Sequence, residues 1–373
     1  MTTWFLLVGL LVLACTEKAP PPAELRIGVV LQLGNVEGPA AVKALQLQAE
    51  QINAAGGVPY GEERARVELI IRTDHQKPDE AVAAARELIY QQGAHAIVGP
   101  FLSRDAIPVG EAAESAQVPM VSPGSSHPKT TEGRDWVFRV TFLDDFQGLA
   151  MARYAREGLE VEEAALLYNV AEPYSSHLSD VFRETFESVG GRITAVETYT
   201  FGETDFSQNI ARIREAGASA VFMPSPNREL LPQIREARRQ NLDVAYLGCD
   251  SWSISGLVAE PGMANAFAVQ HWHPDMAKTL PEAEHFLTSY RNRFGEEPGD
   301  VTALAWDALG LIFEAARSGI SSEAIRDGLA NIRNYNGATG EITFTGYGGN
   351  PPKAGVIVGI EDGRLILQQR ITP

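Results

Sequence analysis

Short apolar runs alternate with amphipathic stretches along most of the chain. The run LRIGVVLQL at residues 25–33 has the continuous hydrophobicity of a strand that is buried on both faces. Val42, Leu45 and Ala49 then recur at helical spacing, and a pair of glycines follows as a helix stop. The same order continues with strands at 67–74, 94–100 and 118–123 and helices at 78–92 and 104–116. It predicts β-α-β units, and therefore a parallel sheet with helices on both faces.

A second set of such units follows Thr141. Its expected strands are residues 164–169, 192–201, 219–225 and 244–249, with helices at 146–157, 175–189, 207–215 and 228–239. The chain then ends in helices at 281–294, 301–318 and 322–331 and short strands at 341–345, 355–359 and 365–369. Two similar α/β lobes fit this order better than one continuous sheet. Ligands of open α/β sheets bind at the carboxyl ends of the strands, so these ends would face each other across a cleft.

The first fourteen residues differ from the rest of the chain. Residues 4–14, WFLLVGLLVLA, are too few to span a bilayer, which takes about 20 residues, and are typical of a secretory signal. They end at Cys15 in the sequence VLAC, which resembles the lipobox of bacterial lipoproteins. We therefore expect residues 1–14 to be a lipoprotein signal peptide and residues 15–23 to be a lipidated Cys15 with a Pro-rich tether. A plain secretory signal with a chance cysteine is the alternative, since residues 1–3 hold no Lys or Arg.

Composition and charge exclude several kinds of protein. The 373 residues include 31 Lys and Arg and 48 Asp and Glu, so the net charge is −17, which argues against a nucleic-acid partner. The only cysteines are Cys15 and Cys249, which excludes a disulfide-rich scaffold and a zinc site built on several thiolates. No cofactor is predicted. Apart from the signal, no segment approaches membrane-spanning length, so we expect a soluble body attached to the membrane through its lipid alone.

The body of the chain resembles a known family through several motifs in a fixed order. They are LRIGVVLQL near the start, QINAAGG (51–57), IVGP (97–100), PMVSPGSS (119–126), FRVTFLDDFQG (138–148), ETDFSQNIARIREAG (203–217) and ALAWDAL (303–309). Together they resemble the type I periplasmic solute-binding proteins, specifically the branched-chain amino acid (Leu/Ile/Val) receptors of ABC transporters. The resemblance covers essentially the whole mature chain.

The resemblance implies an α/β fold of two Rossmann-like lobes with parallel-sheet cores, joined by three crossover segments. We expect residues 24–141 plus 275–337 to form lobe 1 and residues 142–274 plus 338–373 to form lobe 2. The crossovers would lie near 141–144, 272–274 and 338–342.

In this family the first lobe holds the α-carboxylate of the ligand with hydroxyls and backbone N–H groups. The matching positions are Ser103, Gly124 and Ser126. Ser103 precedes a predicted helix, so it could cap that helix beside the positive end of the helix dipole, where an anion is favoured. Gly124 would let the backbone approach closely, and Ser126 could add a hydroxyl donor. Alternatively, Ser103 merely caps its helix and the serines after Gly124 merely shape a turn.

The second lobe would hold the ligand's ammonium group. Asp250 matches a family acidic residue that follows a strand, and a carboxylate shielded in a closed cleft is a natural partner for an ammonium. Tyr174 matches a family tyrosine that contacts the ligand, after insertion of one residue. The alternatives are an N-cap role for Asp250 on a short helix at 251–257 and an ordinary exposed aromatic at Tyr174.

The chain also departs from the family pattern. Two family aromatics fall on Pro226 and Val301, and the loop at residues 34–38 is shorter than usual. The clamp for an α-amino acid is thus kept while the pocket for its side chain is rebuilt, and the ligand need not be Leu, Ile or Val.

Other constellations give little support to different functions. His271 and His273 lie on one face of a strand at a possible metal-ligand spacing, but no third ligand is evident nearby, so no metal is predicted. Asp144 and Asp145 are expected to cap a helix, and Cys249 is expected to be a buried, inert thiol. No nucleophile, base and oxyanion donors come together, so the protein is not expected to be an enzyme.

The sequence therefore predicts a monomeric receptor in a bacterial cell envelope, anchored by lipid on the periplasmic side of a membrane. It would capture an amino acid or a similar small polar or carboxylate solute between two closing lobes and deliver it to ABC permease subunits. The alternative is a ligand sensor or regulatory lipoprotein of the same fold that acts on a protein partner such as a cell-wall enzyme.

Overall fold

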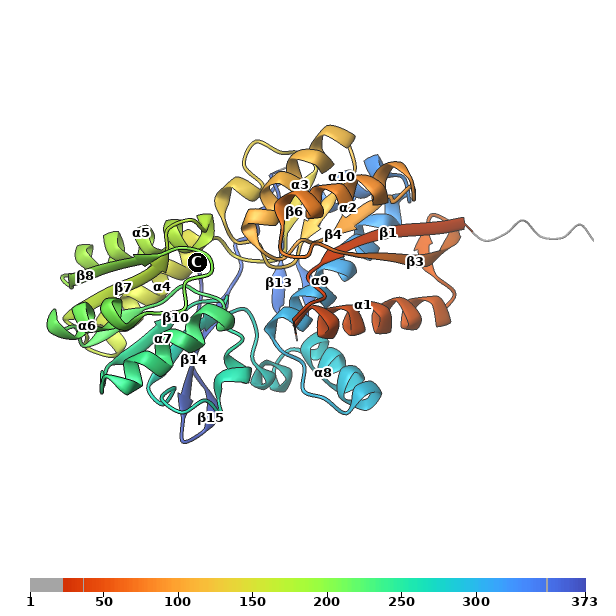
Figure 1. Ribbon diagram of the computed structural model, residues 1–373. Helices are drawn as coiled ribbons and strands as arrows, with labels where there is room; N and C mark the ends of the chain where they lie inside the picture. The colour runs from red at the N-terminus through yellow and green to blue at the C-terminus, as the bar shows by residue number, and fades with distance from the viewer. Residues whose placement is uncertain (1–22, 36, 347) are drawn as a thin grey trace, which may run out of the picture.

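Two α/β lobes lie side by side in the computed structural model, which describes residues 23–35, 37–346 and 348–373 (Figure 1). The expected signal peptide and Cys15 fall outside the described residues. In the described part of the chain, no helix is both long enough and apolar enough to cross a membrane.

The first sheet has six strands in the order β2-β3-β1-β4-β5-β6. The strands are β1 (Ala23–Leu31), β2 (Val58–Tyr60), β3 (Glu63–Thr73), β4 (Ala96–Val98), β5 (Met120–Ser122) and β6 (Val137–Arg139). All pair in parallel except β2, which forms an antiparallel hairpin with β3. The alternation of β1 side chains explains its continuous apolar run, because Val29 faces one core cluster and Val30 faces the other.

Helices cover both faces of this first sheet. They are α1 (Glu37–Ala54), α2 (Pro78–Tyr90), α3 (Ser103–Ala116), α9 (Asp300–Ala315) and α10 (Ser322–Ala330). Helices α1, α9 and α10 share one core cluster with the sheet, and α2 and α3 share the other. We call this sheet with its five helices the first lobe. Two short strands from the C-terminal part of the chain, β12 (Tyr335–Gly337) and β13 (Gly340–Ile342), form a separate hairpin beside α9.

The second sheet has seven strands in the order β15-β14-β11-β10-β9-β7-β8. The strands are β7 (Glu163–Asn169), β8 (Arg192–Tyr199), β9 (Ala220–Phe222), β10 (Ala245–Gly248), β11 (Ala266–Gln270), β14 (Gly355–Glu361) and β15 (Arg364–Ile371). The first five are parallel, whereas β14 and β15 add an antiparallel edge.

Four helices pack on the second sheet and complete what we call the second lobe. They are α4 (Asp144–Arg153), α5 (Pro173–Ser188), α6 (Ser207–Glu215) and α7 (Asn227–Arg239). Helices α4 and α5 bury their apolar sides on one face of the sheet, and α6 and α7 on the other. Helix α8 (Pro281–Phe294) joins the latter cluster through Phe286, which packs against Trp272 and Trp306.

The predicted α/β order is confirmed, with differences at the edges. The antiparallel pairings of β2, β14 and β15 were not predicted, because a strand's partner and direction depend on residues far away in the sequence. The helix expected at 146–157 begins at Asp144 and finishes in one wider turn, Tyr154–Gly158.

The chain passes between the two sheets three times, after β6, after β11 and between β13 and β14. Two carboxylates of helix α9 fasten the chain, one just after β11 and one at the β12–β13 turn that comes before the third passage. Asp300 Oδ1 accepts a hydrogen bond from the backbone N–H of His271 (3.0 Å). Asp307 accepts bonds from the backbone N–H groups of Ala338 (2.7 Å) and Thr339 (2.8 Å). The predicted lobe boundaries lie near these passages, and their exact residues remain a prediction.

Asp307 is therefore expected to be a stability determinant. Its substitution Asp307→Ala leaves two backbone N–H groups without an acceptor and removes a carboxylate that offsets the charge of the fully buried Lys353. We expect the free energy of unfolding, measured by urea denaturation, to fall by about 3–5 kcal/mol. The exposed Asp243→Ala is the matched control and should change it by less than about 0.5 kcal/mol. Equal effects of the two variants would contradict this role.

Candidate ligand-binding site

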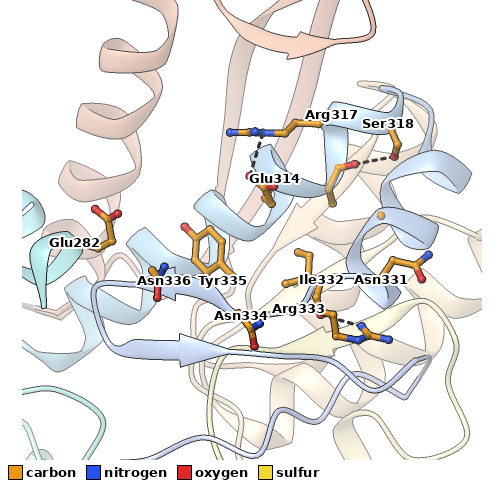
Figure 2. Close-up of a pocket in the computed structure, with 12 residues that line it drawn as sticks. Glu282, Glu314, Arg317, Ser318, Asn331, Ile332, Arg333, Asn334, Tyr335 and Asn336 are labelled. Carbon is orange, nitrogen blue, oxygen red and sulfur yellow. Dashed lines mark hydrogen bonds and ion pairs between the residues drawn. The ribbon is translucent and has the colours of Figure 1, made fainter.

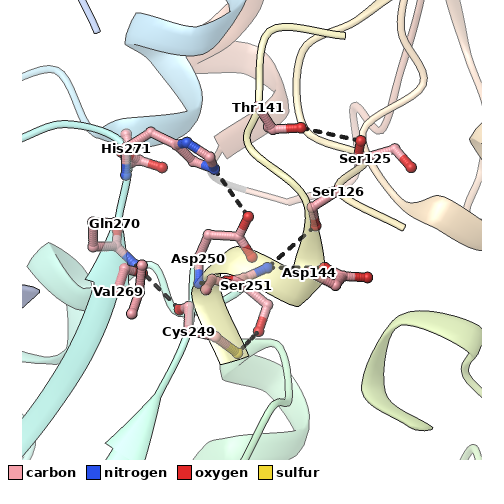
Figure 3. Close-up of polar contacts among 12 residues, drawn as sticks. Ser125, Ser126, Thr141, Asp144, Cys249, Asp250, Ser251, Val269, Gln270 and His271 are labelled. Atoms are coloured by element: carbon pink, nitrogen blue, oxygen red, sulfur yellow. Dashed lines mark hydrogen bonds and ion pairs between the residues drawn. The ribbon is translucent and has the colours of Figure 1, made fainter. Parts of the chain in front are cut away.

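The predicted site residues come from loops at the carboxyl ends of strands in both sheets. Ser103, Gly124 and Ser126 follow β4 and β5 of the first lobe, whereas Tyr174 and Asp250 follow β7 and β10 of the second. Figure 3 shows Ser126 and Asp250 facing the same space, with Asp144 beside them. Residues from both lobes thus gather where the chain passes between the sheets.

Ser103 is buried, and its hydroxyl accepts a hydrogen bond from the Ser125 hydroxyl (2.9 Å). The expectation that Ser103 caps the following helix is wrong. Helix α3 begins with Ser103 itself, and Leu102 occupies the N-cap position without a side-chain bond. Ser103 therefore lies one position further along, in the first turn, where the free N–H groups of the helix still point toward the loop.

Gly124 and Ser126 shape the neighbouring loop. A Cβ atom on residue 124 would lie 2.0 Å from a ring carbon of Phe101, so glycine is needed for that ring to pack against the loop. The Ser126 hydroxyl is fully buried and accepts a hydrogen bond from Gln147 Nε2 (3.3 Å). Arg139 also holds this loop, because its guanidinium donates to the carbonyls of Ser125 (2.8 Å) and His127 (2.9 Å).

Asp250 is held from two sides within the second lobe. Its Oδ1 accepts a hydrogen bond from the Tyr174 hydroxyl (2.7 Å), and its Oδ2 lies 3.0 Å from His271 Nε2. Its side chain is only 7% exposed. The alternative role as a helix cap is not seen, since the short helix that follows is Ile254–Leu257 with Ser253 at its N-cap. Tyr174 is buried rather than exposed.

Gln147, in the first turns of α4, links the two halves of the site. Its amide nitrogen donates to Ser126 Oγ (3.3 Å) and to Asp144 Oδ1 (2.9 Å), while its amide oxygen accepts from the backbone N–H of Asp250 (3.2 Å). A single buried amide thus contacts residues of both predicted subsites. Gln147 was not predicted as a site residue, although it lies inside the FRVTFLDDFQG motif.

Acidic side chains are concentrated here. Burial, reinforced by the nearby charge of Asp250, raises the pKa of Asp144 to about 8, and the same two causes raise the pKa of Asp300. Asp144 does not cap α4 as expected, because Leu143 holds the N-cap position and no side-chain cap bond forms. A positively charged group entering the site would favour the ionised carboxylates and relieve their mutual repulsion.

The histidine that the sequence analysis set aside takes part in this network. Burial lowers the pKa of His271 to about 4, so the ring is neutral near pH 7 and can donate its Nε2 proton to Asp250. The ring also stacks on Phe142 with centroids 3.8 Å apart. Among the described residues, no group of three or more His, Cys, Asp or Glu could hold a metal ion.

A hollow elsewhere on the molecule is polar and lies outside this site. It has a volume of about 550 Å³ and lies by the ends of α9 and α10 and the β12 strand (Figure 2). Tyr335 and Asn336 line one part of it, and Glu314 and Arg317, which form an ion pair (3.0 Å), line another.

Comparison with known proteins places this two-lobed architecture in a class. A family model for periplasmic binding proteins matches residues 25–364. An amino acid binding protein of Pseudomonas aeruginosa is 34% identical over 203 residues, covering 54% of this chain and 53% of that protein. The chain thus matches about half the length of that relative.

Solved structures match over nearly the whole chain. A leucine-binding protein from Thermotoga maritima is 28% identical with a TM-score of 0.85, covering 94% of this chain and 99% of that one. A branched-chain amino acid transporter substrate-binding protein from Streptococcus pneumoniae, solved with isoleucine, is 27% identical with a TM-score of 0.87, covering 94% and 100%. The chain belongs to the periplasmic binding protein family, and its resemblance to the type I receptors of branched-chain amino acid ABC transporters is confirmed.

The raised pKa of Asp144 predicts a pH dependence of stability. The folded protein binds a proton at Asp144 more tightly than the unfolded chain, so this group stabilises the fold at low pH and loses its contribution as pH rises through about 8. Asp144→Asn stays neutral throughout. Between about pH 5 and pH 8 its free energy of unfolding should therefore fall less steeply than that of the wild type, by up to about 1.4 kcal/mol per pH unit.

The measurement is urea denaturation at a series of pH values, with Asp145→Asn at the neighbouring, mainly exposed position as the control. The control should follow the wild type. A profile of Asp144→Asn that runs parallel to the wild type would contradict the assignment of a buried, proton-binding carboxyl to Asp144.

Proposed function

We propose that this protein is an extracytoplasmic solute receptor of an ABC importer, which captures an amino acid or a similar small polar or carboxylate solute between two closing lobes. The observation that carries the proposal is the buried Asp250 carboxylate, oriented by Tyr174 and His271 and linked through Gln147 to Ser126. Family membership and likeness to amino acid receptors support the same conclusion.

The α-carboxylate of the solute would bind to the first lobe. The Ser103 hydroxyl can still donate a proton, and the first turn of α3 presents free N–H groups at the positive end of its dipole. The Ser126 hydroxyl lies beside them and already interacts with Asp144 and Gln147. Gly124 keeps this loop close against Phe101. These features favour an anion of the size of a carboxylate.

The ammonium group of the solute would bind to Asp250. Two donors already fix the two oxygens of this carboxylate, so little side-chain entropy is lost when a third partner arrives. The neighbouring Asp144 carboxyl, whose pKa burial raises to about 8, can lose its proton when a cation arrives and then adds negative charge in the same buried region. An ammonium placed between them gains the strong interaction of opposite charges away from water.

Binding is coupled to closure in this proposal. The first lobe alone would give the solute its carboxylate contacts, and the approach of the second lobe would add Asp250 and Tyr174. Because these added contacts exist only when the lobes are together, the solute stabilises the closed state by their free energy.

The side-chain pocket would differ from that of Leu, Ile or Val receptors. Pro226 lies at the N-cap of α7, and Val301 in the first turn of α9 packs partly against the core of the first lobe. Neither supplies an aromatic wall, so we do not restrict the solute to branched-chain amino acids.

Attachment and partners complete the proposal. Cys15 would carry the lipid that holds the receptor on the periplasmic side of a membrane, and the receptor would act as a monomer that delivers solute to permease subunits. A role as a receptor, and not as an enzyme, agrees with the relatives, which are solute-binding proteins.

Isothermal titration of the full chain against a panel of L-amino acids tests the clamp. At least one amino acid should bind, and its analogue without the amino group should bind far more weakly. Asp250→Asn should weaken binding of that amino acid by about 100-fold or more, because the ammonium loses a buried charged partner. Asp243→Asn, at an exposed position just before β10, is the control. Binding only of solutes without an amino group, unaffected by Asp250→Asn, would contradict the clamp.

The lipid anchor has its own test. In bacterial cells expressing the full chain, Cys15→Ser should move the protein from the membrane fraction to the soluble fraction, while Cys249→Ser, at a buried thiol, should leave it on the membrane. Mass spectrometry of the wild-type N-terminus should show that Cys15 carries lipid. An unmodified N-terminus in a soluble wild type would contradict the anchor.

A further inference from the structure

Two arginines, one from each lobe, contact the opposite lobe near the place where α3 and α5 meet. Arg104 belongs to α3 of the first lobe, and its guanidinium carbon lies 4.8 Å from the centroid of the Phe201 ring in the second lobe. Its Nε lies 3.8 Å from Oε2 of Glu172, which directly precedes α5. Arg228, on α7 of the second lobe, donates a hydrogen bond to the side-chain oxygen of Gln76 in the first.

Arg104 and Glu172 are well covered at this contact, whereas the side chain of Arg228 is 47% exposed. The side chain of Arg104 is 14% exposed and that of Glu172 is 12% exposed. By contrast Arg235, which pairs with Glu260 inside the second lobe, is 63% exposed. Burial raises the pKa of Glu172 to about 7. Covering this carboxylate with the first lobe therefore costs free energy, and a cation that faces the carboxylate offsets that cost.

The chain ties these residues directly to the proposed clamp. Arg104 immediately follows Ser103, and Glu172 lies two residues before Tyr174. Any movement that brings the carboxylate subsite toward the ammonium subsite therefore also brings Arg104 toward Glu172 and Phe201. Asp105, the next residue on α3, also lies near Arg104, at an Nε-to-Oδ1 distance of 3.8 Å, and would remain beside it when the lobes part.

The guanidinium makes several contacts at once. While it faces Phe201 and Glu172, its Nη2 donates to the backbone carbonyl of Gln76 (2.8 Å). Gln76 in turn receives Arg228 on its side chain. A planar guanidinium can contact Phe201, Glu172 and Gln76 at the same time, whereas a lysine ammonium cannot.

We propose that Arg104 and Arg228 are positioning residues that hold the closed lobes together over the bound solute, Arg104 through Glu172 and Phe201 and Arg228 through Gln76. We call this set of five residues the arginine latch. The inference rests on the proposed function, because these residues would determine how long the captured solute stays bound. Each arginine contacts the opposite lobe, and none of the five residues belongs to the proposed ligand-binding site. The latch would therefore change the rate of solute release more than the choice of solute.

The latch is tested by the rate at which the lobes reopen. Fluorophores are placed on Tyr90→Cys in the first lobe and Glu187→Cys in the second, both exposed positions at helix ends. The full chain carries Cys15→Ser so that only the introduced thiols react, since Cys249 is buried. Förster transfer reports lobe separation in the free protein, with an equimolar mixture of the twenty common L-amino acids, and after dilution of that mixture.

We expect Arg104→Gln to speed reopening after dilution by roughly five- to thirty-fold, with little change in the rate of closing. Arg104→Lys should show most of this loss, because it keeps the charge and loses the fork. Glu172→Gln combined with Arg104→Gln should add less than the sum of the single effects. Arg235→Gln is the control and should reopen like the wild type.

If Arg104 only supported the fold, Arg104→Gln would lower the thermal midpoint of the solute-free protein. If Arg104 acts in the latch, the solute-free variant, whose lobes are open, should have a thermal midpoint within about 1 °C of that of the Arg235→Gln control. Reopening of Arg104→Gln at the wild-type rate would overturn the latch, as would a wild type that shows no closed state under any condition. A wild type that is closed without amino acids and is opened by Arg104→Gln would support the latch and count against the proposed function.

Discussion

Buried carboxyl groups constrain how the two lobes come together. Asp144 and Asp300 each lie within electrostatic reach of Asp250, and Asp144 is fully buried. Two buried cations partly offset this charge. Arg139, which is bonded to backbone carbonyls, acts on Asp144, and Lys353, which lies with Asp307 and Thr339, acts on Asp300. Burial and the charge of Asp250 keep Asp144 and Asp300 mostly protonated near pH 7, and a solute that brings positive charge would favour their ionised forms. The proposed preference for a solute with an amino group would thus follow from acidic side chains that the protein already holds.

Recognition and retention would then be carried by different parts of one interface. Near the passages between the sheets, the amide of Gln147 joins the predicted carboxylate and ammonium subsites and fixes their spacing. Where α3 and α5 meet, the arginine latch would add attraction that does not depend on the identity of the solute. A receptor built this way can change its ligand by substitutions in the pocket while it keeps its closing energy, and can change its release rate by substitutions in the latch.

The sequence predicts the repeating α/β units well, because buried parallel strands such as β1 are continuously apolar and their helices are amphipathic. Tyr174 and Asp250 were predicted from family motifs, and the structure joins them by a hydrogen bond. What the sequence misses depends on contacts between distant residues. Gln147 is 103 residues from Asp250, and His271 reaches Asp250 only through the pairing of β10 with β11. The start of α3 at Ser103 is a local error of one position, within the ordinary uncertainty of helix ends.

Helix α9 limits how the lobes can move. Asp300 and Asp307 are seven residues apart, about 10 Å along the helix axis; Asp300 bonds the chain just after β11, and Asp307 bonds the β12–β13 turn that comes before the third passage. Two fixed points on a rigid rod define a line, and a body attached at both can swing about that line but cannot slide or twist freely. If the lobes turn about such a line, the size and shape of a captured solute would set the angle between the lobes, which a downstream partner could read.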